Sequence, residues 1–279
     1  MTNKREQKAI LVLGGTGKTG RRVVERLRGR GVPVRVGSRA AEQPFDWTDR
    51  TTWAPVIHDV GAVYVSFQPD LAVPGALETV GAFADLAVAS GVSRLVLLSG
   101  RGEDEAQAAE KLIQSAGVEW TILRSSWFNQ NFSEDYLRDP VVGGEVALPV
   151  STVREPFVDA DDIAEVAEAA LIEGGHAGQL YELTGPRLLT FADAVAEIAG
   201  ATGRRIDFVP VSIEDYTGAL TAEGVPVEVV ELLTYLFTAV LDGRNAHVAD
   251  GVQRALGRPP RDFVDYAKAA AAAGVWNRA

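Results

Sequence analysis

The sequence predicts an α/β fold, with a doubly wound parallel sheet and a smaller, mostly helical C-terminal cap. Over residues 1–125, short runs of Val, Ile, Leu and Tyr alternate with stretches of helical periodicity. Runs with little polar alternation are typical of parallel strands covered on both faces. Alternating strands and helices indicate a parallel sheet. After Arg124 this alternation stops, and from residue 190 onward the pattern is mostly helical.

Residues that favour the ends of helices set several boundaries. Glu103–Ala116 is followed by Gly117, as expected at a helix C-terminus. Pro226 stands in a first helical turn, and Gly243 follows the other end of that helix. We expect strands at 9–13, 33–37, 45–47, 62–67, 94–99, 120–124, 145–148 and 179–184. We expect helices directly after a glycine-rich loop at 14–20 and at 77–88, 103–116, 159–172, 190–202, 213–222, 226–241 and from 249 onward.

The length of 279 residues suits one large α/β domain with an appended lobe. We expect residues 1–125 to form the core of the sheet and residues 126–279 to form the cap. A segment at about 156–185 is expected to return to the core, because it reads as a helix and a strand of the same type.

Composition excludes several classes of protein. The chain has no cysteine, so disulfides, thiolate nucleophiles and iron–sulfur clusters are excluded, and its three histidines are too far apart in sequence to suggest a metal site. The net charge of −11 argues against a nucleic-acid partner. No apolar run approaches the roughly 20 residues of a membrane span, and Ala9–Leu13 is too short for the core of a signal peptide. We therefore expect a cytoplasmic protein with no membrane contact.

The glycine-rich loop carries the strongest functional motif. Gly14-x-x-Gly17-x-x-Gly20 follows a predicted strand and opens a predicted helix, the context in which such a motif is informative. The first glycine permits a tight turn, the second lets the backbone approach a diphosphate, and the third lets helix and strand pack closely. The spacing differs from that of a P-loop, which disfavours a nucleotide triphosphatase. We predict a Rossmann-type dinucleotide site with contacts from Gly14, Gly15, Thr16, Gly17, Lys18, Thr19 and Gly20.

The end of the second strand indicates which dinucleotide binds. An NAD site usually places Asp or Glu there to hold the ribose hydroxyls, whereas this chain has Ser38 and Arg39. Ser and Arg can hydrogen-bond and neutralise a 2′-phosphate, so NADP is preferred and NAD remains possible. Strand ends further along supply the remaining candidates, which are Asp46 and Trp47 for adenine and Ser66, Phe67 and Gln68 near the nicotinamide ribose.

Several blocks of sequence together resemble a known family. GGTGKTGRRVVERL, VPVRVGSR, RLVLLSGRG, VEWTILRSSWFNQNF and PFVDADDIAEVAEAAL occur in this order. They resemble the NmrA-like branch of the atypical short-chain dehydrogenase/reductases, and the resemblance covers nearly the whole chain. Within the branch, the chain looks most similar to NAD(P)H-binding proteins of secondary metabolism, including ergot-alkaloid-type reductases and tailoring proteins of antibiotic and aromatic polyketide biosynthesis. The resemblance implies either a quinone or imine reductase or a redox-sensing regulator.

The chain departs from the usual short-chain dehydrogenase in its acid–base residues. That family uses Tyr-x-x-x-Lys, in which the lysine lowers the pKa of the tyrosine, and no tyrosine here has a lysine four residues on. Many relatives carry a lysine three residues before a helical glutamate, where this chain has Gln107 before Glu110. Lys111 would point to another face of that helix, and we expect it at the surface.

Other side chains are candidates for contact with a substrate. Ser99 ends a strand and can contact the cofactor or hydrogen-bond a substrate oxygen, unless the protein itself satisfies its hydroxyl. Arg101 can hold an acidic oxygen, or it is a solvated arginine. Trp127, Phe128 and Asn131 follow the 120–124 strand, where they either line a pocket for a flat substrate or form aromatic core. Gln68 is a further candidate.

Three functions remain open. The first is an NAD(P)H-dependent oxidoreductase that reduces a quinone, enone or iminium of a polycyclic aromatic natural product, because such acceptors need little proton assistance. The second is a tailoring enzyme, monooxygenase-like in its oxygenation or coupling of a cofactor-reduced aromatic polyketide. The third is a non-catalytic regulator that senses NAD(P). No flavin or metal motif is present, and a monomer and a homodimer are equally compatible with the sequence.

Overall fold

The computed structural model describes residues 8–277, which divide into two compact units. The first unit contains the chain up to Ser125 together with Ala160–Leu183 and Gly251–Arg258. The second contains Ser126–Asp159, Thr184–Asp250 and the residues from Pro259 onward. The sequence did not predict that the short segment Gly251–Arg258 belongs to the unit that contains the sheet.

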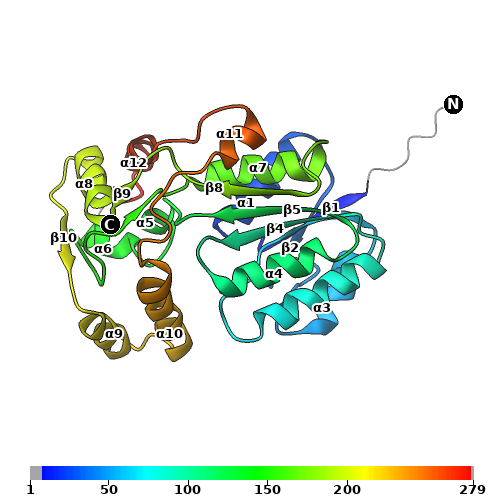
Figure 1. The fold of residues 1–279 in the computed structure, drawn as a ribbon, viewed down its shortest axis with the longest axis horizontal. Helices are drawn as coiled ribbons and strands as arrows, with labels where there is room; N and C mark the ends of the chain where they lie inside the picture. Colours follow the sequence, from blue (N-terminus) through cyan, green and yellow to red (C-terminus); the bar gives the residue numbers. More distant parts are fainter. Residues whose placement is uncertain (1–7, 278–279) are drawn as a thin grey trace. The chain divides into compact units, whose positions relative to one another are not determined.

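The first unit is built on a parallel sheet, which among the described residues has six strands in the order β2-β1-β3-β4-β5-β8. The helices α3 and α4 lie on one face of this sheet, and α1 and α7 lie on the other (Figure 1). The predicted doubly wound α/β fold is confirmed. The strands are β1 (Ala9–Leu13), β2 (Val34–Gly37), β3 (Val60–Val65), β4 (Arg94–Gly100), β5 (Glu119–Ser125) and β8 (Gln179–Leu183). The helices are α1 (Lys18–Gly29), α2 (Trp53–Ile57), α3 (Ala76–Ala89), α4 (Asp104–Gln114), α7 (Ala160–Ile172) and α11 (Gly251–Leu256), with a 3₁₀ turn at Arg50–Thr52.

The order of the strands reverses between β1 and β3, because the chain runs from β1 outward to β2 and then returns past β1 to β3. Ligands of open parallel sheets bind outside the carboxyl ends of the strands at such a switch point. The strands β1, β2 and β3 all end at the edge of the sheet where the glycine-rich loop begins. The topology therefore directs the search for a site to this edge.

The strand predicted at Phe45–Trp47 is wrong. Asp46 makes only an isolated bridge to Asp49, and its backbone carbonyl accepts a hydrogen bond from the Trp53 indole at 2.8 Å. Phe45 is apolar because its ring packs edge-on against Phe83, with centroids 5.7 Å apart. The apolar residues therefore fix a loop to the core. From its pattern alone, a short apolar run of this kind cannot be distinguished from a strand.

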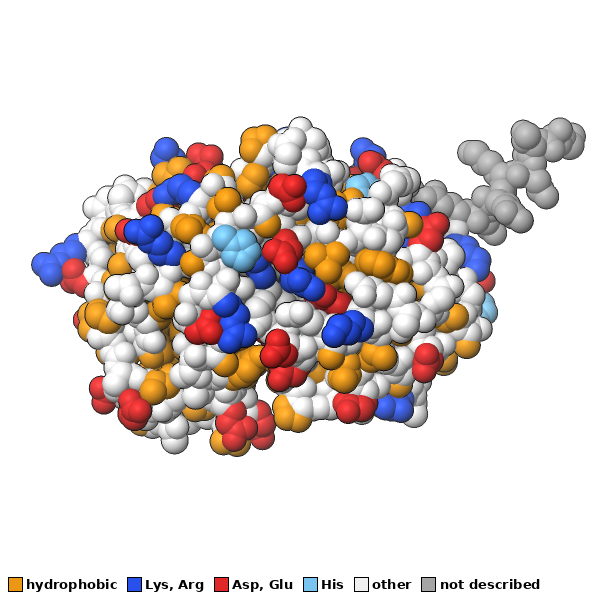
Figure 2. All heavy atoms as spheres, viewed as in Figure 1, with side chains coloured by type: hydrophobic (Ala, Val, Ile, Leu, Met, Phe, Trp, Pro, Cys, Tyr) orange, Lys and Arg blue, Asp and Glu red, His pale blue; other side chains and the backbone are white. Residues whose placement is uncertain are grey.

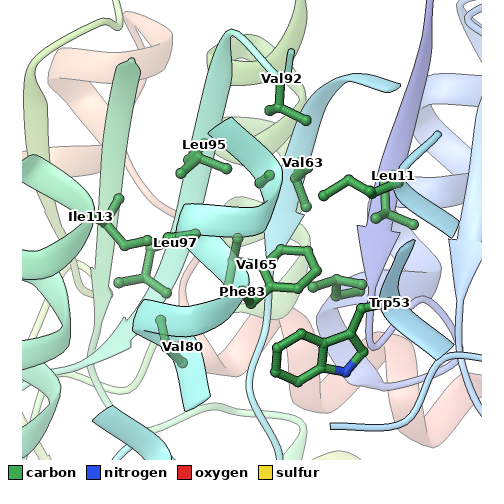
Figure 3. Close-up of a cluster of buried hydrophobic side chains, with 14 of the residues drawn as sticks. Leu11, Trp53, Val63, Val65, Val80, Phe83, Val92, Leu95, Leu97 and Ile113 are labelled. Carbon is green, nitrogen blue, oxygen red and sulfur yellow. The ribbon is translucent and has the colours of Figure 1, made fainter. Parts of the chain in front are cut away.

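The core of the first unit lies between the sheet and the helices α2, α3 and α4. Figure 3 shows Phe83 of α3 beside Trp53 and Val65, with Leu97 and Ile113 in the same cluster. The strands contribute alternate residues to this core, because successive side chains point to opposite faces of the sheet. This packing holds the carboxyl ends of the strands in register.

The second unit has its own core and two small sheets. β6 (Glu145–Leu148) pairs in parallel with β10 (Asp207–Pro210), and β7 (Arg154–Glu155) pairs antiparallel with β9 (Leu189–Thr190). Phe132 lies in an aromatic cluster, and its carbonyl accepts the Trp276 indole N–H at 2.7 Å. The helices are α5 (Asn131–Glu134), α6 (Arg138–Gly143), α8 (Phe191–Thr202), α9 (Ile213–Ala222), α10 (Val227–Tyr235) and α12 (Phe263–Ala272).

Two helices predicted for this part of the chain are interrupted. The one expected at 226–241 continues from α10 into a wider π-helical turn at Leu236–Val240. The one expected from residue 249 onward is split into α11 and α12, and the segment between them contains Pro259 and Pro260. Proline removes a backbone donor and cannot continue a helix, which explains the second break.

Acidic and basic side chains are interspersed on the face shown in Figure 2. Among the described residues, no helix combines the length and the apolarity that crossing a membrane requires.

Removing the Phe83 ring tests the account of the first core. We expect Phe83→Ala to lower the free energy of unfolding by about 3–5 kcal/mol, because the fully buried ring leaves a cavity among three other aromatic rings. Urea denaturation followed by circular dichroism measures this loss. Leu112→Ala is the control, since Leu112 on α4 is 37% exposed and should cost less than half as much. Equal losses in the two variants would contradict the assignment of the core.

Candidate cofactor site

The site is built around the turn that joins β1 to α1. Gly14 has a φ of +62°, in the left-handed region that favours glycine, and its carbonyl accepts the Gly17 N–H at 2.8 Å. A Cβ on Gly20 would overlap the carbonyl oxygen of Gly14. The first turn of α1 therefore approaches the end of β1 closely, and it does so because residue 20 has no side chain.

The second feature of the site is the N-terminus of α1. Gly17 is the N-cap of the helix, and no side chain caps this end. A helix leaves its first N–H groups without intrahelical acceptors, and the positive end of its dipole lies there. A Cβ on Gly17 would lie 3.2 Å from the Gly14 carbonyl oxygen and 3.4 Å from the Gln68 amide nitrogen, so a methyl group would fill the space beside the Gly17 backbone. Such a helix end suits a diphosphate.

Three segments converge on the turn. The Gly15 N–H donates to the Gly37 carbonyl at 3.3 Å, which ties the end of β2 to the loop. A Cβ on Gly14 would lie 3.4 Å from Ser66, directly after β3. The structure thus brings together the glycine loop, the end of β2 and the Ser66–Gln68 segment. Their contact with a dinucleotide stays a prediction.

Two residues of the loop have contrasting environments. The Thr19 hydroxyl oxygen is buried and accepts a hydrogen bond from Tyr64 of β3 at 3.0 Å. Burial raises the pKa of Tyr64, so the phenol keeps its proton and remains the donor. Thr16 is exposed. Thr19 can therefore offer a ligand its backbone, while its side chain joins helix and sheet.

The end of β2 presents the residues predicted to choose between NADP and NAD. The Ser38 hydroxyl oxygen is buried and has no hydrogen-bond partner in the described part of the chain, whereas the Arg39 side chain is exposed. Asp46 accepts hydrogen bonds from the Thr48 N–H at 2.9 Å and the Thr48 hydroxyl at 2.8 Å. These bonds lower the pKa of Asp46, and the charge of Arg39 adds to the effect. Asp46 thus carries a negative charge within electrostatic range of Arg39.

Trp47 and Phe67 form part of the wall of this region. The Trp47 indole donates to the Ser66 carbonyl at 3.2 Å, and its ring lies 4.9 Å from the ring of Phe67. Trp47 thereby connects the loop after β2 with the end of β3. The predicted contact of Trp47 with adenine stays a prediction.

A buried charged network occupies the ends of β4 and β5. The Ser99 hydroxyl donates to Glu110 Oε1 at 2.6 Å, and the Arg124 Nε donates to the same oxygen at 2.9 Å. Arg124 also reaches Glu182 at 3.2 Å, and Arg101, 4% exposed, lies 3.3 Å from the other oxygen of Glu182. Ser99 and Arg101 are thus engaged with protein carboxylates. Their predicted contacts with cofactor and substrate remain untested.

Three of the predicted substrate residues, Trp127, Phe128 and Asn131, lie in the second unit, whereas Gln68 and Arg101 lie in the first. Trp127 packs against Phe191 and Phe237 with centroids 5.7 and 5.6 Å apart, and its indole nitrogen is buried without a hydrogen-bond partner. Phe128 is half-buried beside a backbone bridge to Val158. Asn131, also half-buried, starts α5. These three residues are near each other in sequence. Their contact with a substrate stays a prediction.

The sequence prediction missed two features of this edge. One is the network of Glu110, Arg124 and Glu182, although Glu110 and its lysine neighbour had been singled out. Lys111 is exposed, as predicted. The other is a pair of carboxyl groups, Asp70 after β3 and Glu103 after β4, which lie close enough for the charge of Asp70 to raise the pKa of Glu103. An acidic residue three positions after the end of a buried strand was the available clue to Glu103.

The residues present fit a dinucleotide. The backbone at Gly17 forms a cradle that a side chain would fill, and the partnerless Ser38 hydroxyl is a polar group that a ligand can satisfy. Among residues 8–277, no three His, Asp or Glu side chains are grouped so that they could hold a metal ion.

A methyl group at the cradle tests the site. Gly17 has an ordinary φ of −80°, and a Cβ there would lie 3.2 Å from the Gly14 carbonyl oxygen, so the loop must shift locally by a few tenths of an ångström. We expect Gly17→Ala to fold and to weaken dinucleotide binding by about tenfold or more, because the methyl group separates the backbone from the phosphates. Fluorescence titration measures the dissociation constant.

Gly29→Ala is the matched control on the same helix. A Cβ on Gly29 has no neighbour within 4 Å, so the variant should bind the dinucleotide normally and be slightly more stable. An unchanged dissociation constant in Gly17→Ala would contradict the placement of the diphosphate.

Comparisons with known proteins agree with this geometry. A model of the NAD(P)H-binding family matches residues 14–173. The chain is 30% identical over 282 residues to the NAD(P)H azoreductase of Xenophilus azovorans, covering 95% of this chain and 98% of that protein. It is also 30% identical over 282 residues to festuclavine synthase I of Penicillium roqueforti, with 93% and 97% covered.

A solved structure shares the fold. The NADPH-dependent quinone oxidoreductase of Escherichia coli, complexed with NADPH, superposes with a TM-score of 0.77 at 21% identity, covering 93% of this chain and 99% of that one. NmrA, a negative transcriptional regulator, also shares the fold, with a TM-score of 0.68 at 16% identity and 94% of this chain and 95% of that one covered. The chain belongs to the NAD(P)H-binding family of oxidoreductases.

Proposed function

We propose that this chain is an NADPH-dependent reductase of a quinone, enone or iminium group in a polycyclic aromatic compound. The observation that carries the proposal is the backbone cradle at Gly17, with the partnerless Ser38 hydroxyl and Arg39 at the end of β2. When bound, a reduced nicotinamide supplies a hydride. The chain's own residues bind the diphosphate, distinguish the 2′ group and orient the ring.

The proposed class of acceptor follows from the missing acid–base pair and from the aromatic residues that the chain offers to a substrate. The sequence has no Tyr-x-x-x-Lys, so the usual acid–base pair for alcohols and ketones is missing. Acceptors that are already electron-poor need less assistance. Trp127 and Phe128 supply aromatic surface, and the buried Trp127 N–H lacks an acceptor that a substrate oxygen could provide. The similarity to an NAD(P)H azoreductase and to a festuclavine synthase supports a reductase.

Turnover with a panel of acceptors tests the proposal. We expect loss of the absorbance of reduced nicotinamide with quinones, enones or iminium ions, and no uptake of oxygen. Oxygen uptake coupled to cofactor oxidation would favour the tailoring alternative, an oxygenation or coupling of a reduced aromatic polyketide. Tight binding of the dinucleotide without oxidation by any acceptor would contradict the reductase and favour a sensing regulator.

The preference for NADPH has its own test. We expect Arg39→Ala to raise the dissociation constant of NADPH by about tenfold or more, because a hydrogen bond to a charged group contributes about 1.5–3 kcal/mol. The constant for NADH should change little. Asp46→Asn is the control of opposite sign, since it removes a negative charge near Arg39 and should favour NADPH. Equal losses for the two cofactors in Arg39→Ala would contradict the preference.

A further inference from the structure

Two carboxyl groups lie at the ends of neighbouring parallel strands. Asp70 follows β3 and Glu103 follows β4, and these strands pair directly. The end of β2 carries Ser38 and Arg39, on the opposite side of β1. A dinucleotide that crosses this edge with its adenosine ribose near β2 therefore has its nicotinamide half toward β3 and β4.

Backbone geometry fixes Glu103 at this edge. The chain turns at Gly102, whose φ is +84°, and returns the Glu103 carboxyl group to the end of β4. There it contacts Gly100 at the position where a Cβ would stand. Glu103 is 7% exposed, and its Oε2 is buried and receives no hydrogen bond from a donor group among the described residues. Asp70 is held by the Ala72 N–H at 2.9 Å.

The pair retains a proton at neutral pH. Two carboxylates in a buried position repel each other, so the state in which both are ionised is disfavoured. Burial, and then the charge of Asp70, raise the pKa of Glu103 to about 9. Glu105 and Glu110 on α4 add negative charge in the same direction. Burial also raises the pKa of Asp70. Asp70 is partly exposed, which gives the pair a route to water.

The neighbouring polar groups are engaged differently. The Ser99 hydroxyl donates to Glu110, and Arg101 pairs with Glu182. Arginine does not release its proton in proteins. The carboxyl pair is thus the group at the ends of β3 and β4 with a proton that can be transferred.

We propose that the Asp70–Glu103 pair is the proton donor to a neutral acceptor, an inference that rests on the proposed reductase function. A quinone gains a hydride from the reduced nicotinamide, which is oxidised, and one proton from the pair. The hydride brings both electrons, the proton completes the second O–H bond, and the product is a quinol. The pair is left with two negative charges until it regains one proton from water.

The chemistry of the acceptor provides the sharpest control. A quinone needs a hydride and a proton, whereas a triarylmethyl cation dye needs only a hydride and becomes a neutral product. We expect Glu103→Gln and Asp70→Asn to slow kcat for the quinone by about 100-fold, the scale of general acid catalysis. Reduction of the dye should change less than twofold. Asp104→Asn removes an exposed charge from the adjacent position and should leave both reactions unchanged.

The pH profile and the stability of the fold give independent readouts. Wild-type kcat with the quinone should fall as the pH rises through about 9, and kcat with the dye should not. The folded pair keeps a proton that the unfolded chain releases above its ordinary Glu pKa of 4.5. The free energy of unfolding should therefore decrease from about pH 5 toward the folded pKa, with a smaller slope in Glu103→Gln.

The outcomes separate this inference from the proposed function. If the wild type reduces both acceptors and the two variants slow them equally or not at all, the proton-donor role is overturned and the reductase stands. If the wild type binds NADPH but reduces neither acceptor, both proposals fail. An equal pH slope of stability in the wild type and Glu103→Gln would overturn the shared proton itself.

Discussion

The geometry of the cofactor site depends on the close approach of Gly20 to the carbonyl of Gly14. Because neither residue has a side chain there, the first turn of α1 lies against the end of β1, with its N-terminus at the carboxyl edge of the sheet. The Gly15 N–H then connects the loop with β2, and Ser66 closes it from β3. A larger residue at position 20 would displace the helix and separate all three segments. The geometry of the phosphate cradle therefore follows from backbone packing.

The same edge distributes its charges by burial and pairing. Glu110, Arg124 and Glu182 form a network in which opposite charges offset each other, and Ser99 is part of it. Asp70 and Glu103 have no such cation among the groups that shift their pKa, so they retain a proton. Neighbouring strand ends thus differ in function. The network fixes the ends of β4 and β5 electrostatically, whereas the carboxyl pair that follows β3 and β4 carries the proton that we propose is transferred.

The elements whose pattern lies within one continuous run of residues were predictable. Ala9–Leu13, Glu145–Leu148 and Ile213–Ala222 have the predicted bounds, and the glycine spacing identified the cradle. Features that depend on long-range partners were not. Phe45–Trp47 was taken for a strand because its apolar residues pack on α3, and Ser99 could not be assigned to Glu110 without the path of α4. The Asp70–Glu103 pair joins two loops through the sheet, so no local spacing indicates it.

Hydrogen exchange of individual amides, measured with and without saturating NADPH, tests the central claim most directly. The account predicts that amides at the start of α1, from Gly17 to Gly20, gain protection when the dinucleotide binds, together with those that follow β2 and β3. Amides of α12 in the second unit should serve as an unaffected reference. Saturable binding that leaves the amides of Gly17–Gly20 unprotected would contradict the placement of the diphosphate at this helix.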